Sequence, residues 1–513
     1  MTLSPAGRAR AAWRALTSMG TALVLLFLLA LAAIPGALLP QRSLNETKVQ
    51  AYIAEHPVIG PWLDRLQFFD VFASSWFTAI YVLLFVSLVG CLTPRTVEHI
   101  RSLRATPVPA PRNLSRLPKH AEADVAGSPE TVVAQLDADL RGWRRSVRSA
   151  DGVTEISAEK GYLREFGNIV FHFSLLGLLV AVAAGKLFSY EGNVVVIANG
   201  GPGFCSASPA AFDSFRAGNT VDGTSLYPIC LRVNDFQARY LPSGQATSFT
   251  ADIDYQVGSD LTGGVWRPYR LEVNRPLRVG GDRVYLQGHG YAPTFTVVFP
   301  NGEKRTQTVQ WQPDDAQTLL SSGVVRFDPP PGLFPPEQRR KNQIAVTGLL
   351  APTQQLDGTL LSSSFPELRD PAVAVDIYRG DAGLDTGRPQ SLFALDHRLI
   401  EQKRLTKVKR INLALGEEVR LDDGTVVRFD GATPFVNIQV SHDPAQVWVL
   451  VSALTMMGGL MVSLIVRRRR VWARIVPGRP GTVKVELGGL ARTDNSGWGG
   501  EFDRLARRVA EVE

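Results

Sequence analysis

The chain has 513 residues, of which 45% are hydrophobic, 20% are charged and only three are cysteines. These numbers exclude an intrinsically disordered chain, a collagen-like fibre and a small domain held together by disulfides. The net charge is +7, from 55 Lys and Arg against 48 Asp and Glu, and its distribution along the chain decides what it implies about partners.

Four apolar runs are each about as long as a helix needs to be to cross a lipid bilayer. We place these spans at residues 17–41, 74–92, 168–187 and 447–466. The first span follows three arginines, so a secretory signal peptide is the alternative. Because the run is longer than a signal-peptide core and has no clear small-residue cleavage site, we predict a retained span.

Basic residues gather on one side of these spans. They occur in residues 1–16, in residues 93–167 and, as four consecutive arginines, at the start of residues 467–513. Lys and Arg flank the cytoplasmic ends of spans, so we predict a multi-pass protein of the plasma membrane with both termini inside the cell. The basic runs are then topology signals, and no nucleic-acid partner is predicted.

The segments between the spans differ in character. Residues 42–73 form a short outside loop with an amphipathic pattern suited to the bilayer interface. The inside loop, residues 93–167, reads as a small mixed element with a helix over PETVVAQLDADLRGW. Residues 188–446, outside, alternate polar and apolar residues in runs such as EVRLDDGTVVRFDG. We therefore predict an α+β membrane protein: four transmembrane helices, with a large, mainly antiparallel β domain, sandwich-like or an open barrel, between the third and the fourth.

His172 is the ionisable residue in these spans that most suggests a function. Burying such a group in a bilayer is costly, so it marks a candidate site. A ligand to a metal or to haem iron is one interpretation, because imidazole is a common axial ligand of haem. The alternative is a neutral imidazole that hydrogen-bonds to a neighbouring helix.

The three cysteines predict no redox centre. Cys205 and Cys230 both fall in the outside domain, where the setting is oxidising, and could pair as a structural disulfide. Cys91, at the inner end of the second span, is expected to be a small apolar filler. CxxC and CxxCH are both absent, so the chain has no thioredoxin-like centre and holds no c-type haem of its own.

Other catalytic signals are missing. The sequence has no nucleotide-binding, GxSxG or HExxH motif, and we predict no catalytic residue. His289 is expected at a strand end in a glycine turn, and the remaining histidines show no metal-binding spacing. A self-contained soluble enzyme is not expected; the pattern favours a membrane component that works with partners.

Several segments resemble the ResB (CcsB) family of system II cytochrome c biogenesis, in its actinobacterial form. They are IPGALLPQRSLN at 34–45, GPWLDRLQFFDVFASSWFTAIYVLLFVSLVGC at 60–91, KGYLREFGNIVFHFSLLGLL at 160–179, VNRPLRVGGDRVYLQGHGYAPTF at 273–295, GLDTGRPQSLFALD at 383–396 and SLIVRRRRVWAR at 463–474. The resemblance covers nearly the whole chain.

The resemblance implies a function in haem delivery. Family members act with a ResC (CcsA) membrane subunit that carries a tryptophan-rich WWD segment, and the complex attaches haem to the CxxCH cysteines of apocytochrome c. A thioredoxin-like protein keeps those cysteines reduced. The family's intramembrane histidine, matched here by His172, is proposed to ligate the haem, a transiently bound haem b, on the inner side. This chain has no WWD cluster, so a separate subunit must supply it, and the chain is not a complete enzyme.

Two other classes of function compete with this one. A membrane-anchored scaffold could bind a partner protein through its β domain without any haem contact. A secondary transporter is disfavoured, because four spans show no inverted repeat.

Overall fold

The computed structural model describes residues 4–43, 46–384, 387, 390–491, 498 and 500–511. Two of the family-like segments, at 34–45 and 383–396, contain residues outside this description: 44, 45, 385, 386, 388 and 389. The chain divides into two units, Met1–Ala183 with Ala445–Glu513, and Ala184–Pro444.

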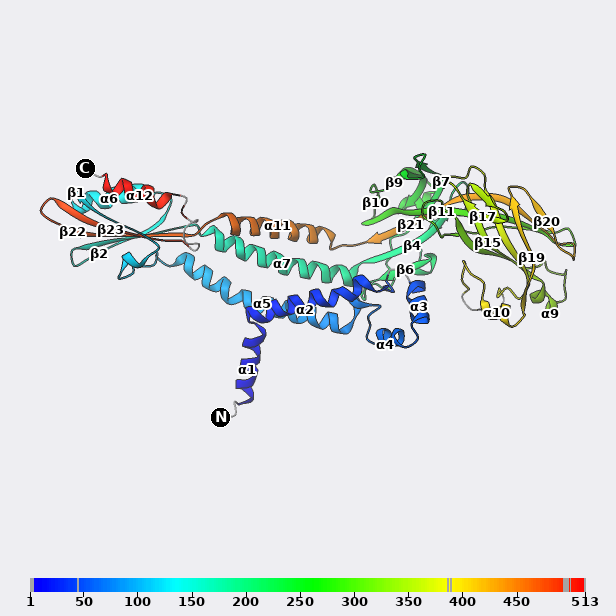
Figure 1. Ribbon diagram of the computed structural model, residues 1–513, viewed down its shortest axis with the longest axis horizontal. Coiled ribbons are helices and arrows are strands. Elements are labelled where there is room, and N and C mark those ends of the chain that lie inside the picture. Colours follow the sequence, from blue (N-terminus) through cyan, green and yellow to red (C-terminus); the bar gives the residue numbers. More distant parts are fainter. Residues whose placement is uncertain are drawn as a thin grey trace. The chain divides into compact units, whose positions relative to one another are not determined.

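Among the residues that the structure describes, four helices are long and apolar enough to cross a membrane, as predicted (Figure 1). They are α2 (Met19–Leu38), α5 (Ser75–Arg104), α7 (Leu163–Phe188) and α11 (Gln446–Ile465). Ser18 and Ser74 cap the first two, each accepting a hydrogen bond from a backbone N–H three residues on. Helix α5 extends a dozen residues beyond the expected span. Its last turn carries the basic residues Arg101 and Arg104, which are not part of the apolar run that predicted the span.

Short helices flank the first two spans. They are α1 (Pro5–Leu16), α3 (Glu46–Glu55), α4 (Ile59–Arg65) and the 3₁₀ turn η1 (Val71–Ala73). The buried side chain of Gln41 organises this loop: its amide nitrogen donates to the carbonyl of Phe68 (3.1 Å), and its amide oxygen accepts from the N–H of Val71 (3.1 Å). Arg42 adds ion pairs to Asp64 (2.6 Å) and Asp70 (3.2 Å). Gln41 and Arg42, which belong to the first family-like segment, therefore stabilise the fold of this loop.

The first unit also contains a five-stranded antiparallel sheet, ordered β1-β23-β22-β3-β2. Its strands are β1 (Lys119–Ala126), β2 (Arg144–Ala150), β3 (Val153–Lys160), β22 (Arg469–Pro477) and β23 (Thr482–Ala491). Helices α6 (Pro129–Asp139) and α12 (Glu501–Ala510) cover one face over a shared apolar core, and the 3₁₀ turn η2 (Leu114–Arg116) precedes the sheet (Figure 1). The two segments predicted as inside loop and inside tail thus form one domain. Sequence patterns did not reveal the pairing of β22 with β3, because these strands are some 300 residues apart.

The second unit is built almost entirely of antiparallel strands, which confirms the predicted fold class (Figure 1). The strands are β4 (Tyr190–Ile197), β5 (Phe204–Cys205), β6 (Ser214–Ala217), β7 (Ile229–Tyr240), β8 (Ala246–Val257), β9 (Arg267–Glu272), β10 (Leu277–Val279), β11 (Asp282–Val298), β12 (Lys304–Thr308), β13 (Gln312–Pro313), β14 (Ser321–Phe327), β15 (Gln343–Ala351), β16 (Gln354–Asp357), β17 (Leu360–Ser363), β18 (Ala372–Gly380), β19 (Leu405–Ala414), β20 (Glu418–Arg420) and β21 (Val426–His442). Short helical turns connect some of them: α8 (Ser259–Gly263), η3 (Pro209–Ala211), α9 (Pro336–Arg339), η4 (Arg340–Asn342) and α10 (His397–Glu401).

Two long strands, β11 and β21, pair along nearly their whole length and connect two apolar cores. At one end their sheet packs against the sheet β5-β7-β8-β9, and at the other end against the sheet β13-β14-β15-β18-β19. The pairing is interrupted by register shifts at Leu286/Gly288 and Thr294/Phe295. Bulges of this kind bend a strand, which suits strands that pass from one core to the next.

Candidate functional site

His172 lies on the membrane helix α7, with its ring partly buried. Its Nδ1 is 2.8 Å from the carbonyl oxygen of Asn168, one turn earlier in the helix. A carbonyl can only accept, so Nδ1 carries the proton and donates it to that oxygen. The lone pair is then on Nε2, which has no partner among the residues that the structure describes. An imidazole fixed in this way can coordinate iron through Nε2.

The packing around His172 is apolar. The ring of Phe171 meets it edge to face, with centroids 5.1 Å apart. Leu176 lies one turn further along the same face of the helix. Phe173, the next residue, is exposed on another side of α7.

Helix α7 is held on two sides. A Cβ on Gly167 would be 2.8 Å from the carbonyl oxygen of Gly459, and a Cβ on Gly459 would be 2.7 Å from the backbone nitrogen of Phe171. Helices α7 and α11 therefore meet backbone to backbone beside His172, as small residues allow in membranes. From α5, the Tyr81 hydroxyl donates to the carbonyl of Leu179 (2.5 Å).

A polar cluster around Glu159, here called the Glu159 clamp, joins the start of α7 to the end of α11. The buried carboxylate of Glu159 pairs with Arg470 (2.8 Å) and Arg468 (3.2 Å) and accepts a hydrogen bond from the Tyr162 hydroxyl. Arg468 also pairs with Glu165 (2.9 Å) on α7. The clamp thus connects the helix that carries His172 to the helix that returns from the second unit.

The charges of the clamp stabilise each other. Burial alone would raise the pKa of Glu159, but the hydrogen bond from Tyr162 and the two arginines lower that pKa below its usual range. Arg469 pairs with Glu501. The arginines that the sequence indicated only as topology signals are therefore also structural. That role could not be found locally, because Glu159 and Arg468 are 309 residues apart.

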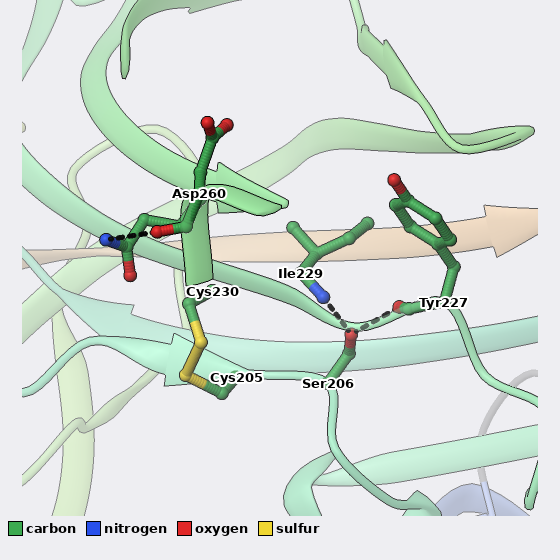
Figure 2. The surroundings of a disulfide bond; sticks show 7 residues. Cys205, Ser206, Tyr227, Ile229, Cys230 and Asp260 are labelled. Atoms are coloured by element: carbon green, nitrogen blue, oxygen red, sulfur yellow. Dashed lines mark hydrogen bonds between the residues drawn. A yellow bond between two sulfur atoms is a disulfide. The ribbon is translucent and has the colours of Figure 1, made fainter. Parts of the chain in front are cut away.

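Cys205 and Cys230 form a disulfide within the second unit (Figure 2). The two residues face each other across strands β5 and β7, with Cα atoms 4.0 Å apart. Beside them, the Ser206 hydroxyl donates to the carbonyl of Tyr227 and accepts from the N–H of Ile229, both at 2.9 Å (Figure 2). Cys91 is a free thiol.

His289 lies in the middle of β11, so the prediction of a strand end in a glycine turn was wrong. The neighbouring glycines are strand residues, and Gly288 follows a bulge. The ring packs between Phe236 and Phe249, and its Nε2 is 2.7 Å from the Tyr240 hydroxyl. Burial lowers the pKa of His289 to about 4, so it is a neutral core residue at physiological pH.

Comparison with known proteins shows to which family the chain belongs. The model of the ResB-like family matches residues 19–503. The chain belongs to the ResB-like family. Relatives of this ResB-like protein include the cytochrome c biogenesis protein CcsB of Synechococcus sp. (strain CC9311), which is 23% identical over 97% of both chains. Those of Gloeobacter violaceus (strain ATCC 29082 / PCC 7421) and Paulinella chromatophora are 25% and 22% identical, over 86% and 97% of this chain and 84% and 98% of theirs.

Proposed function

We propose that this ResB-like protein takes part in cytochrome c maturation as the subunit that receives haem b within the membrane and passes it outward for covalent attachment to apocytochrome c. Haem is the cargo here. The observation that carries the proposal is the imidazole of His172, whose Nδ1 is bound to Asn168 and whose Nε2 has no described partner. The relatives named as cytochrome c biogenesis proteins support the same process.

The proposal includes a direction in the membrane. Both termini and the five-stranded sheet lie in the cytoplasm, and the second unit lies outside. The basic flanks of the helices support this orientation, and so does the disulfide of the second unit, since disulfides persist in oxidising compartments.

Partners supply the chemistry that this chain does not contain. In thioether formation, a cysteine S–H of the CxxCH segment adds across a haem vinyl group, so both cysteines must be reduced. A thioredoxin-like protein keeps them reduced, and a membrane subunit of the ResC (CcsA) type with its WWD segment holds the haem during attachment. Much of the surface of α2 and α11 is apolar and exposed, which suits contact with lipid and with such a subunit.

The test is an absorption spectrum of the full chain purified with its membrane partner. We expect His172→Ala to lose a Soret band that the wild type shows, and added imidazole to restore it. His397→Ala, which removes an exposed histidine at the start of α10, is the matched control and should keep the wild-type spectrum. If His172→Ala, purified without added haemin, retains the whole of the wild-type band, iron is not ligated here and the scaffold function becomes the better explanation.

A further inference from the structure

A second histidine, His442, lies in the second unit, and one of its ring nitrogens is held in a hydrogen bond. Nδ1 of His442 is 2.8 Å from Oδ1 of Asp282, and the other carboxylate oxygen of Asp282 accepts a hydrogen bond from the Tyr190 hydroxyl (2.5 Å). The side chain of Asp282 is only 1% exposed, whereas that of His442 is 33% exposed. The three residues come from strands β11, β21 and β4, so tertiary structure alone brings them together.

The geometry fixes the tautomer of His442. The ionised carboxylate can only accept, so Nδ1–H donates to it, and Nε2 has no hydrogen-bond partner among the described residues. A histidine that ligates iron or zinc almost always donates its other N–H to a carboxylate or a carbonyl in this way. The Tyr190 ring stacks on the imidazole, at 5.5 Å between centroids and 11° between planes, and prevents the histidine from turning.

The neighbouring turn lies beside the imidazole. Gly281 has a positive φ of 89°, and a Cβ on it would be 3.4 Å from Cε1 of His442. A side chain at that position would meet Cε1 and Nδ1 (3.7 Å) at ordinary contact distance, while Nε2 lies more than 4 Å from it.

The number of coordinating side chains decides whether the site fits a bare metal ion or a haem iron. In the described part of the chain, the one group of three or more His, Cys, Asp or Glu side chains that could hold a metal ion is His120, Glu122 and Glu486. A bare ion at His442 would therefore have too few protein ligands for a stable site. A haem iron already has four porphyrin nitrogens, so a single imidazole can complete an axial position.

We propose that His442 is an axial ligand for haem iron, with Asp282 and Tyr190 as its positioning residues; this proposal rests on the proposed function. Tyr190 is two residues beyond the end of α7, the helix that carries His172, and His442 is four residues before the start of α11. Tyr190 and His442 are therefore close in the chain to two membrane helices. In this position His442 would receive haem that leaves the membrane.

The experiment is a titration of ferric haem b (haemin) into the full chain in detergent, in a His172→Ala background that silences the inner site. We expect a haemin-dependent Soret shift in His172→Ala and its loss in His172→Ala/His442→Gly, with recovery when imidazole is added. Recovery by imidazole also shows that the variant is folded. His172→Ala/His397→Ala is the control and should titrate like His172→Ala alone.

Asp282→Asn tests the positioning role separately. The amide keeps the shape of the carboxylate but removes its charge, so we expect haemin affinity in the His172→Ala background to fall by about 10-fold or more and the haem reduction potential to rise. A merely structural Asp282 would leave the potential of bound haem unchanged.

The outcomes separate the two proposals. Equal haemin binding with and without His442 overturns the His442 site, as does a His172→Ala chain that binds no haemin while the wild type binds it; the second result leaves the proposed function standing. Binding that depends on His442 but not on His172 supports the His442 site and overturns the inner ligand of the proposed function.

Discussion

At the scale of the residue, three histidines show how surroundings determine what an imidazole can do. In His172 and His442 an oxygen acceptor binds Nδ1 and leaves Nε2 without a described partner. In His289 it is Nε2 that is bound, by Tyr240, among phenylalanine rings. The first two are suited to bind iron and the third is suited to a core. The sequence showed His172 because its span is apolar, but it could not show His442, whose partner Asp282 lies 160 residues away.

Burial of His289 makes the second unit sensitive to acid. The pKa of His289 is about 4 in the folded protein against an ordinary 6.5, so above pH 6.5 the residue is neutral in both the folded and the unfolded chain. As the pH falls below 6.5, only the unfolded chain takes up the proton, and stability is lost until the pH reaches the folded pKa. At about 1.4 kcal/mol per pH unit, the loss is about 3 kcal/mol.

Thermal unfolding of the purified chain between pH 7 and pH 4.5 checks this dependence. His289→Gln can still accept the Tyr240 hydrogen bond but does not titrate, so its stability should fall less over this range. His397→Gln, at an exposed site, should follow the wild type. Parallel curves for the wild type and His289→Gln would contradict the prediction.

At the scale of the element, the position of α7 depends on two contacts in its N-terminal half. The Glu159 clamp holds its first turn, and the backbone contact between Gly167 and Gly459 holds it against α11. The four helices were predictable, since an apolar run of this length has few alternatives. The pairing of α7 with α11 was not, because many small residues occur in these spans and hydropathy does not distinguish between them.

Two adjacent glycines of α11 give a matched test of that contact. A Cβ on Gly459 would be 2.7 Å from the backbone of α7, whereas a Cβ on Gly458 meets nothing within 4 Å. We expect Gly459→Leu to separate the helices, to cost about 1–3 kcal/mol and to weaken the proposed haem binding at His172, since α7 shifts with its histidine. Gly458→Leu should change neither quantity.

The Soret absorbance and the melting temperature of the two variants, each purified with the proposed partner subunit, measure these effects. Equal spectra and equal melting temperatures would mean that the crossing of α7 and α11 does not position His172.

At the scale of the whole molecule, long-range pairing combines segments that look independent in the sequence. The loop after α5 and the tail after α11 form one sheet, and β22 from the tail lies in its interior. In the second unit, β11 and β21 connect two cores. The disulfide is the one covalent link, among the described residues, between segments distant in the chain, and its chemistry depends on the compartment.

The disulfide therefore tests the proposed orientation. With the second unit outside the cell, the native chain should expose one thiol to a maleimide reagent after denaturation without reductant, and three after reduction. Labelling of all three cysteines without reductant would place the second unit on the reducing side.

Replacement of both cysteines tests the energetic role of the bond. Cys205 and Cys230 are 25 residues apart, and a loop of that length corresponds to about 3 kcal/mol. Cys205→Ser/Cys230→Ser should lower the melting temperature of the second unit, whereas Cys91→Ser should leave it unchanged.

The sequence by itself determined the membrane class, the four apolar helices, the antiparallel β domain and the candidate residues His172, Cys205 and Cys230. Those features depend on the local composition and on the spacing of apolar residues, both of which can be read from the sequence without the tertiary structure. Only the tertiary structure decided that Glu159 meets Arg468, that the tail completes the first sheet and that Asp282 orients His442. Such contacts join residues 160 or more positions apart. They depend on which strands pair and in which register, and a local pattern does not contain that information.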